Sequence, residues 1–107
     1  MAKAVIKSGI CGFTIDATAD CQDGRHAKIS IVTDCPNWRK IAAELQEVDV
    51  FEELFQKKLE GQVYRIFARY SPHVSCPGPS GLLKLIEVAA GLALPQTVSM
   101  DIGKEDS

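Results

Sequence analysis

The sequence predicts an α+β fold: a three-stranded antiparallel meander, then about four helices packed on one of its faces, and a C-terminal strand. Two patterns support this class. Up to about residue 33, apolar and polar side chains alternate in short stretches, which is the period of a half-buried strand. Later in the chain, apolar side chains recur every three or four positions, as on the buried face of a helix. The chain has 107 residues, 46% hydrophobic and 24% charged, so we expect a single domain over residues 1–107.

The meander is predicted from three alternating segments with short connections. These segments are residues 3–8, 13–19 and 27–33. Between the second and the third, Asp23-Gly24 is a strong signal for a tight hairpin turn. Antiparallel strands of this kind bury one face and leave the other to solvent, so the helices are expected on one face only.

The helices are predicted from apolar spacing and from residues suited to helix starts. Pro36 lies in a first turn, where its missing N–H costs nothing, and Asp34 or Cys35 is the expected cap. Asp49 followed by Glu52 resembles a capping box that opens a short second helix. The apolar stripes of the first three helices are Trp38, Ile41, Ala42, Leu45 and Val48; Phe51, Leu54, Phe55 and Leu59; and Val63, Ile66, Phe67 and Tyr70.

The remaining elements follow from the C-terminal third of the chain. The residue types of the third stripe would also suit a strand, and its spacing favours a helix. The last helix is expected over about residues 80–90, with Gly91 as its stop. Residues 97–102 alternate again and predict a strand at an edge of the sheet, followed by a charged tail over residues 103–107.

Charge and hydropathy exclude several classes of protein. The net charge is −2 and no basic cluster is present, so neither nucleic acid nor an anionic membrane surface is an expected partner. The N-terminal residues have no apolar run of signal-peptide length, and the nearly apolar window Leu82–Leu94 is too short to span a bilayer. We therefore expect a cytoplasmic protein whose four cysteines stay reduced.

Three of these cysteines are expected to meet at one edge of the sheet. Cys11 follows the first strand and Cys35 follows the third, so the meander returns both to the same edge. Cys21 lies in the hairpin turn at the far end, roughly 20 Å away for a strand rising about 3.3 Å per residue, and is excluded. Cys76 joins the other two if the last helix packs with its N-terminus at their edge.

The chemistry that this arrangement predicts is that of a thiolate site. Cys35 and Cys76 begin or precede helices, where free N–H groups and the helix dipole favour an anion. The thiolate is the form that binds metals, and several thiolates together repel one another unless a metal or cluster lies between them. Cys11, Cys35 and Cys76 are thus candidate ligands of zinc or an iron–sulfur cluster, with His73 or Asp34 as a candidate fourth ligand.

The order of these features resembles the NifU-like iron–sulfur cluster assembly scaffold domain. The segments that carry the likeness are Gly9-Ile10-Cys11-Gly12, Thr33-Asp34-Cys35-Pro36 and His73-Val74-Ser75-Cys76, within residues 3–91. Phe13 stands where that family has a ligand aspartate. The resemblance implies a cluster-binding scaffold and a partner protein that donates or receives metal or sulfur.

A second resemblance carries no chemistry. The run Cys76-Pro77-Gly78-Pro79 and the segment 87–95 look like a small prokaryotic family with no assigned function.

Two further functions stay open on the residues alone. One is a thiol or redox protein with Cys76 or Cys35 as nucleophile and His73 as base. The other is a metal-free interaction domain whose cysteines are small buried hydrophobic residues, with Asp34 only a helix cap. His26 is expected to be exposed and without a role. No serine triad, phosphate-binding loop or paired-carboxylate motif is present, so an enzyme is the less favoured interpretation.

Overall fold

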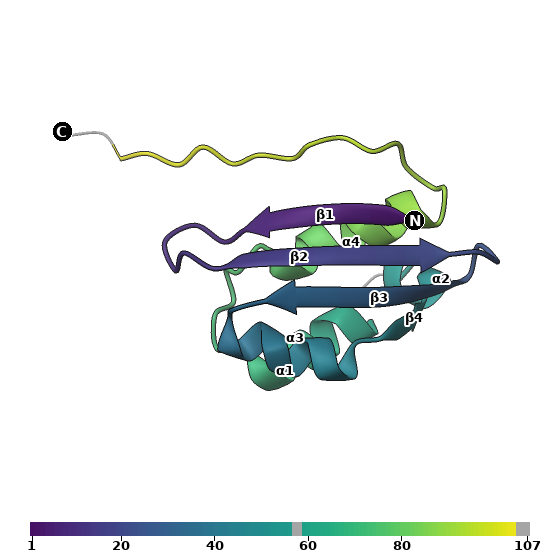
Figure 1. The fold of residues 1–107 in the computed structure, drawn as a ribbon, viewed down its shortest axis with the longest axis horizontal. Helices are drawn as coiled ribbons and strands as arrows, with labels where there is room; N and C mark the ends of the chain where they lie inside the picture. The colour runs from purple at the N-terminus through teal and green to yellow at the C-terminus, as the bar shows by residue number, and fades with distance from the viewer. Residues whose placement is uncertain (57–58, 105–107) are drawn as a thin grey trace.

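An antiparallel sheet covered on one face by helices forms the fold (Figure 1). The computed structural model describes residues 1–56 and 59–104. Its elements are β1 (Ala2–Lys7), β2 (Thr14–Cys21), β3 (His26–Thr33), α1 (Pro36–Glu44), β4 (Glu47–Asp49), α2 (Val50–Leu54), α3 (Gln62–Tyr70) and α4 (Gly78–Ala89). The strands are adjacent in the order β1-β2-β3-β4. The predicted α+β class, with a three-strand meander followed by helices, is confirmed.

Alternation along the strands separates an apolar inner face from an exposed outer face. Ala4 pairs with Ala17, which pairs in turn with Ile31, and all three pack towards the core beneath the helices. Asp16 and Val32, which pair with each other, are exposed on the opposite face. Because the side-chain period of a strand is two, this register buries every second residue of the meander.

The helices divide the inner face of the sheet between them. In Figure 1, α4 runs behind β1 and β2, whereas α1 and α3 lie at the β3 side. A Cβ on Gly81 of α4 would lie 2.5 Å from the Cδ1 atom of Ile6, so glycine at this position lets the helix approach β1. The largest fully buried side chains are Trp38, Ile15, Ile41, Leu45, Leu82, Ile86, Val48, Val50, Val63 and Pro79.

The first helix is shorter than predicted, and a short strand follows it. The apolar stripe predicts Val48 on this helix, which is wrong: α1 ends at Glu44, and Val48 lies in β4, opposite Ala27 of β3. Val48 is buried, as the stripe predicts, but from the strand. The edge of β3 that does not face β2 has free backbone groups, and residues 47–49 pair with them as β4. Three residues are too few for an alternating pattern to predict a strand.

The buried face of the second helix also differs from the prediction. Phe51, Phe55 and Leu59 are 45%, 64% and 71% exposed, whereas Val50 and Glu53 are buried. The predicted cap is confirmed, because the Asp49 carboxylate accepts the backbone N–H groups of Phe51 and Glu52. The helix has five residues and starts directly at the end of β4, so the strand sets which side faces the core.

The predicted C-terminal strand is wrong for this structure. Residues 92–104 have no regular secondary structure; after α4 the segment turns, runs in the same direction as β1 and continues past the end of that strand in Figure 1. An alternating sequence becomes a strand only when a neighbouring strand supplies hydrogen bonds, and the described part of the chain supplies none here. Of the predicted charged tail, residues 105–107 lie outside the described residues.

The start of α4 provides a test of the packing. A Cβ added at Gly78 would collide with the ring of the buried Trp38, whereas one at Gly103 would meet nothing within 4 Å. We expect Gly78→Ala to lower the free energy of unfolding by about 1–3 kcal/mol, because a fused ring in a packed core cannot yield. Urea denaturation measures this difference. Gly103→Ala is the matched control and should stay within about 0.5 kcal/mol of the parent chain; equal stability of both variants would contradict the packing.

Candidate functional site

The three predicted site cysteines lie in segments at one end of the sheet. Cys11 is in the loop between β1 and β2, Cys35 is the N-cap of α1 directly after β3, and Cys76 lies two residues before α4. In Figure 1, the β1–β2 loop, the start of α1 and the start of α4 are all at the same end of the strands. Cys21 is the last residue of β2, at the other end. The topology therefore separates three cysteines from the fourth.

The surroundings of the three thiols differ. Cys35 and Cys76 are half-buried and pack against the hydrophobic core, whereas Cys11 is exposed. The backbone N–H of Gly78 donates to the Cys76 Sγ atom at 3.4 Å. This contact places the Cys76 sulfur at the start of α4.

Hydrogen bonds fix the backbone at Cys35. Its N–H donates to Thr33 Oγ1 at 3.2 Å, and that hydroxyl donates to the Thr14 carbonyl of β2 at 2.7 Å. The Cys35 carbonyl accepts the N–H of Arg39 at 2.9 Å in the first turn of α1. The end of β3 and the start of α1 are thus tied to the neighbouring strand, and Cys35 is held between them.

Cys11 lies on a tight loop with two left-handed glycines. Gly9 and Gly12 have φ of 86° and 77°, and the Gly12 N–H donates to the Gly9 carbonyl at 2.9 Å. Ser8 and Phe13 close the base of the loop through a backbone hydrogen bond of 3.1 Å. The loop turns Cys11 outwards, so its thiol is the most accessible of the three.

The two candidate fourth ligands have different surroundings. The Asp34 carboxylate forms an ion pair with Arg39 Nη2 at 3.2 Å, and its side chain is 91% exposed. Asp34 is therefore not the helix cap, since Cys35 occupies that position. His73 is exposed, and its carbonyl accepts the Cys76 N–H at 3.2 Å, which closes a turn between the two residues.

These groups do not form a preassembled metal centre. Within residues 1–56 and 59–104, no three His, Cys, Asp or Glu side chains are grouped so that they could hold a metal ion. Thiol and imidazole groups are the ligand types that a soft metal prefers. In this conformation they are not close enough together to bind one. The fold brings the segments of Cys11, Cys35 and Cys76 to one end of the sheet without grouping their side chains.

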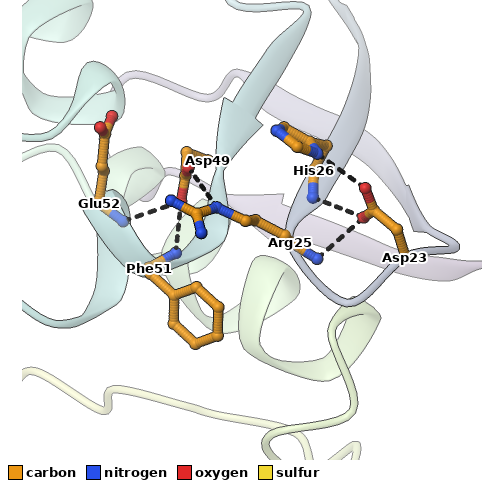
Figure 2. Close-up of polar contacts among 6 residues, drawn as sticks. All are labelled: Asp23, Arg25, His26, Asp49, Phe51 and Glu52. Atoms are coloured by element: carbon orange, nitrogen blue, oxygen red, sulfur yellow. Dashed lines mark hydrogen bonds and ion pairs between the residues drawn. The ribbon is translucent and has the colours of Figure 1, made fainter.

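A cluster of polar side chains that was not expected from the sequence lies at the opposite end, in the β2–β3 hairpin (Figure 2). Asp23 Oδ1 accepts the backbone N–H groups of Arg25 and His26 at 2.9 and 2.8 Å, and Asp23 Oδ2 lies 2.7 Å from His26 Nδ1. The N–H and the ring of His26 hold the pKa of Asp23 well below its usual range. The same hydrogen bond raises the pKa of His26. His26 is exposed as predicted, but it is paired.

Arg25 joins this hairpin to α2. Its Nε atom donates to Asp49 Oδ2 at 2.9 Å, and Asp49 Oδ1 accepts the N–H groups of Phe51 and Glu52 (Figure 2). The guanidinium carbon lies 5.7 Å from the centre of the Phe51 ring. All these groups are on the surface and serve turn and cap formation, so we assign the cluster a structural role. The Asp-x-x-His spacing after a strand was the signal that could have revealed it.

Glu53 carries a buried carboxylate that was not expected from the sequence. Glu53 Oε1 accepts the Val63 N–H at 2.8 Å, and Glu53 Oε2 has no partner among the described residues. Burial raises the pKa of Glu53. Gly61 has no side chain with which to cap α3, so Glu53 caps that helix from α2. This carboxylate is a structural cap between two helices.

The fold and the positions of Cys11, Cys35 and Cys76 define a small α+β protein with three cysteine-bearing segments at one end of its sheet. The chain belongs to a family of unknown function, DUF6951, whose model matches residues 2–102. No match to the NifU-like family was found, and the resemblance to an uncharacterised family agrees with the result. The search of curated proteins and the search of solved structures gave no match. No helix in the described part of the chain is long and apolar enough to cross a membrane.

The hairpin cluster makes a pH-dependent prediction. In the folded chain, His26 should titrate above its ordinary pKa of 6.5, and Asp23→Asn should return the midpoint towards that value because the charged partner is gone. A histidine with a raised folded pKa stabilises fully below the unfolded pKa, and this contribution is lost as pH rises through the folded pKa. An NMR titration of the His26 ring measures both midpoints. Asp34→Asn, at the other end, should leave the His26 midpoint unchanged; an unchanged midpoint in Asp23→Asn would contradict the pairing.

Proposed function

We propose that this chain binds a soft metal ion, zinc in the simplest case, or a small iron–sulfur cluster, with Cys11, Cys35 and Cys76 as thiolate ligands. One observation carries the proposal: three loops that are distant in sequence present their cysteines at one end of the sheet, while Cys21 lies at the other end. Three thiolates are a common ligand set for zinc and for clusters.

The half-buried cysteines supply the fixed part of the proposed site. Cys35 is held by its backbone hydrogen bonds to Thr33 and Arg39, and Cys76 accepts the N–H of Gly78. Both sulfurs lie at the starts of helices of nine and twelve residues. The positive ends of these helices would offset part of the repulsion between two bound thiolates.

The Cys11 loop supplies the movable part. Its two glycines have open space where a Cβ would lie, and the exposed thiol has no core packing to lose on moving. Ligation needs Cys11 to swing towards Cys35 and Cys76, and the binding energy of the metal or cluster offsets the cost of ordering the loop. An exposed ligand on a glycine loop also suits exchange with a partner protein that donates or receives metal or sulfur.

His73 is the better candidate for the fourth ligand. Asp34 is already paired with Arg39 and would have to give up that ion pair. His73 belongs to the same short turn as Cys76, whose N–H donates to the His73 carbonyl. The exposed imidazole of His73 has no hydrogen bond to another described residue to give up and lies three residues from Cys76, whereas Asp34 is held by its ion pair with Arg39.

Metal or cluster binding is tested on protein that is expressed and purified without oxygen. We expect about one metal ion or cluster per chain, measured by elemental analysis and by the sulfur-to-metal absorption bands of iron–sulfur centres. Cys35→Ala and Cys76→Ala should lose most of it because each removes an anchored ligand. Cys21→Ala is the matched control, a half-buried cysteine at the other end, and it should retain the full amount.

Two outcomes would contradict the proposal. The first is a well-folded chain that holds no metal or cluster under these conditions, and the second is equal loss in Cys21→Ala. If the folded, metal-free chain also has a Cys76 that is alkylated faster than the similarly buried Cys21, the thiol-nucleophile alternative takes its place. The Gly78 N–H that donates to Cys76 Sγ is the observation that favours that alternative.

A further inference from the structure

The C-terminal tail carries the pattern of a strand without the structure of one. Val98, Met100 and Ile102 are 58%, 70% and 86% exposed, and polar residues alternate with them. Single exposed apolar residues are ordinary on a protein surface. Three at strand spacing, on a segment that pairs with no strand of the described chain, instead form one continuous apolar side that is exposed.

The sheet has a free edge of matching length. β1 pairs with β2 on one side only and is the first strand in the order β1-β2-β3-β4. On its other side, no strand in the described part of the chain meets the backbone groups of its six residues. β1 contains no proline to block pairing. Such an edge is a template for an additional strand.

We propose that residues 97–102 of one copy pair with β1 of a second copy, and that the exchange is reciprocal. The result is a dimer with a continuous sheet across the two chains. The donor segment and the acceptor strand each have six residues, and every chain carries one of each. A reciprocal exchange leaves no donor or acceptor unused, so the assembly closes at two copies.

The direction of the tail favours the second copy over the chain's own β1. In Figure 1, the tail runs in the same direction as β1, so folding back on its own chain would give a parallel pair. All the existing pairs in this sheet are antiparallel. A two-fold axis perpendicular to the sheet reverses β1 of the second copy, so the exchanged pair is antiparallel and slightly more stable per residue.

The side chains on both faces of β1 fit such a strand. On the inner face, Ala4 and Ile6 are only partly buried, and the three apolar tail side chains would continue their layer over the flank of α4. On the outer face, Lys3 and Lys7 are exposed, and the tail brings Asp101 to the same face. Opposite charges on neighbouring strands stabilise the pairing. The same orientation of the tail thus places its apolar side chains on the inner face and Asp101 beside the lysines on the outer face.

The test compares two tail variants of the full chain. Met100→Asp places a charge on the apolar side of the tail, and Ser99→Asp places the same charge on the polar side. Because burying an unpaired carboxylate opposes association, we expect Met100→Asp to raise the dimer dissociation constant at least about tenfold and Ser99→Asp to change it little. Sedimentation equilibrium or light scattering over a concentration series measures the mass. Both residues are exposed, so neither substitution removes core packing.

Amide hydrogen exchange on the same samples locates the contact. In the dimer, the amides of residues 97–102 should be protected, and Met100→Asp should release them while leaving β2 and β3 protected. A chain that stays monomeric at all concentrations overturns the proposal. So does a dimer with unprotected tail amides, and so does a monomer with protected ones, which would mean that the tail folds on its own β1.

Discussion

The burial of the Trp38 indole is the contact on which the rest of the structure depends. Its side chain is 1% exposed, and its ring centre lies 5.9 Å from that of Phe67 on α3. The start of α4 lies against the same ring, where Gly78 leaves no Cβ in the way. One aromatic side chain therefore fixes α1, α3 and α4 relative to one another. A large rigid group in a close-packed core allows few alternative arrangements of the helices around it.

This contact also decides where two of the cysteines lie. Cys35 precedes Trp38 by three residues, and Cys76 precedes Gly78 by two. When Trp38 and Gly78 meet, the starts of α1 and α4 come to the same end of the sheet. The opposite end is built differently, from surface charges of the hairpin and the cap of α2. The molecule thus has a thiol-bearing end set by core packing and a charged end set by turn chemistry.

Much of this organisation was predictable because the local patterns were strong. Alternation defined the three strands of the meander, and the Asp-Gly turn defined their connection. Pro36 and Asp49 marked helix starts correctly, since each acts on backbone groups within one turn of itself. Strand directions alone sent Cys21 to the other end from Cys11 and Cys35. The predictions were wrong for β4, for the buried side of α2 and for residues 97–102. The conformation of each of these depends on contacts with residues far away in the sequence.

The sequence by itself determined the class of fold, the polarity of the meander and the separation of Cys21 from the other cysteines, because these follow from side-chain period and chain direction. Only the tertiary structure decided that α4 starts beside Trp38, that Glu53 caps α3, and that the Cys76 segment joins those of Cys11 and Cys35 at one end. Such features rest on contacts between residues far apart in the chain. A local sequence pattern does not determine the distances between side chains that come into contact only when the core packs.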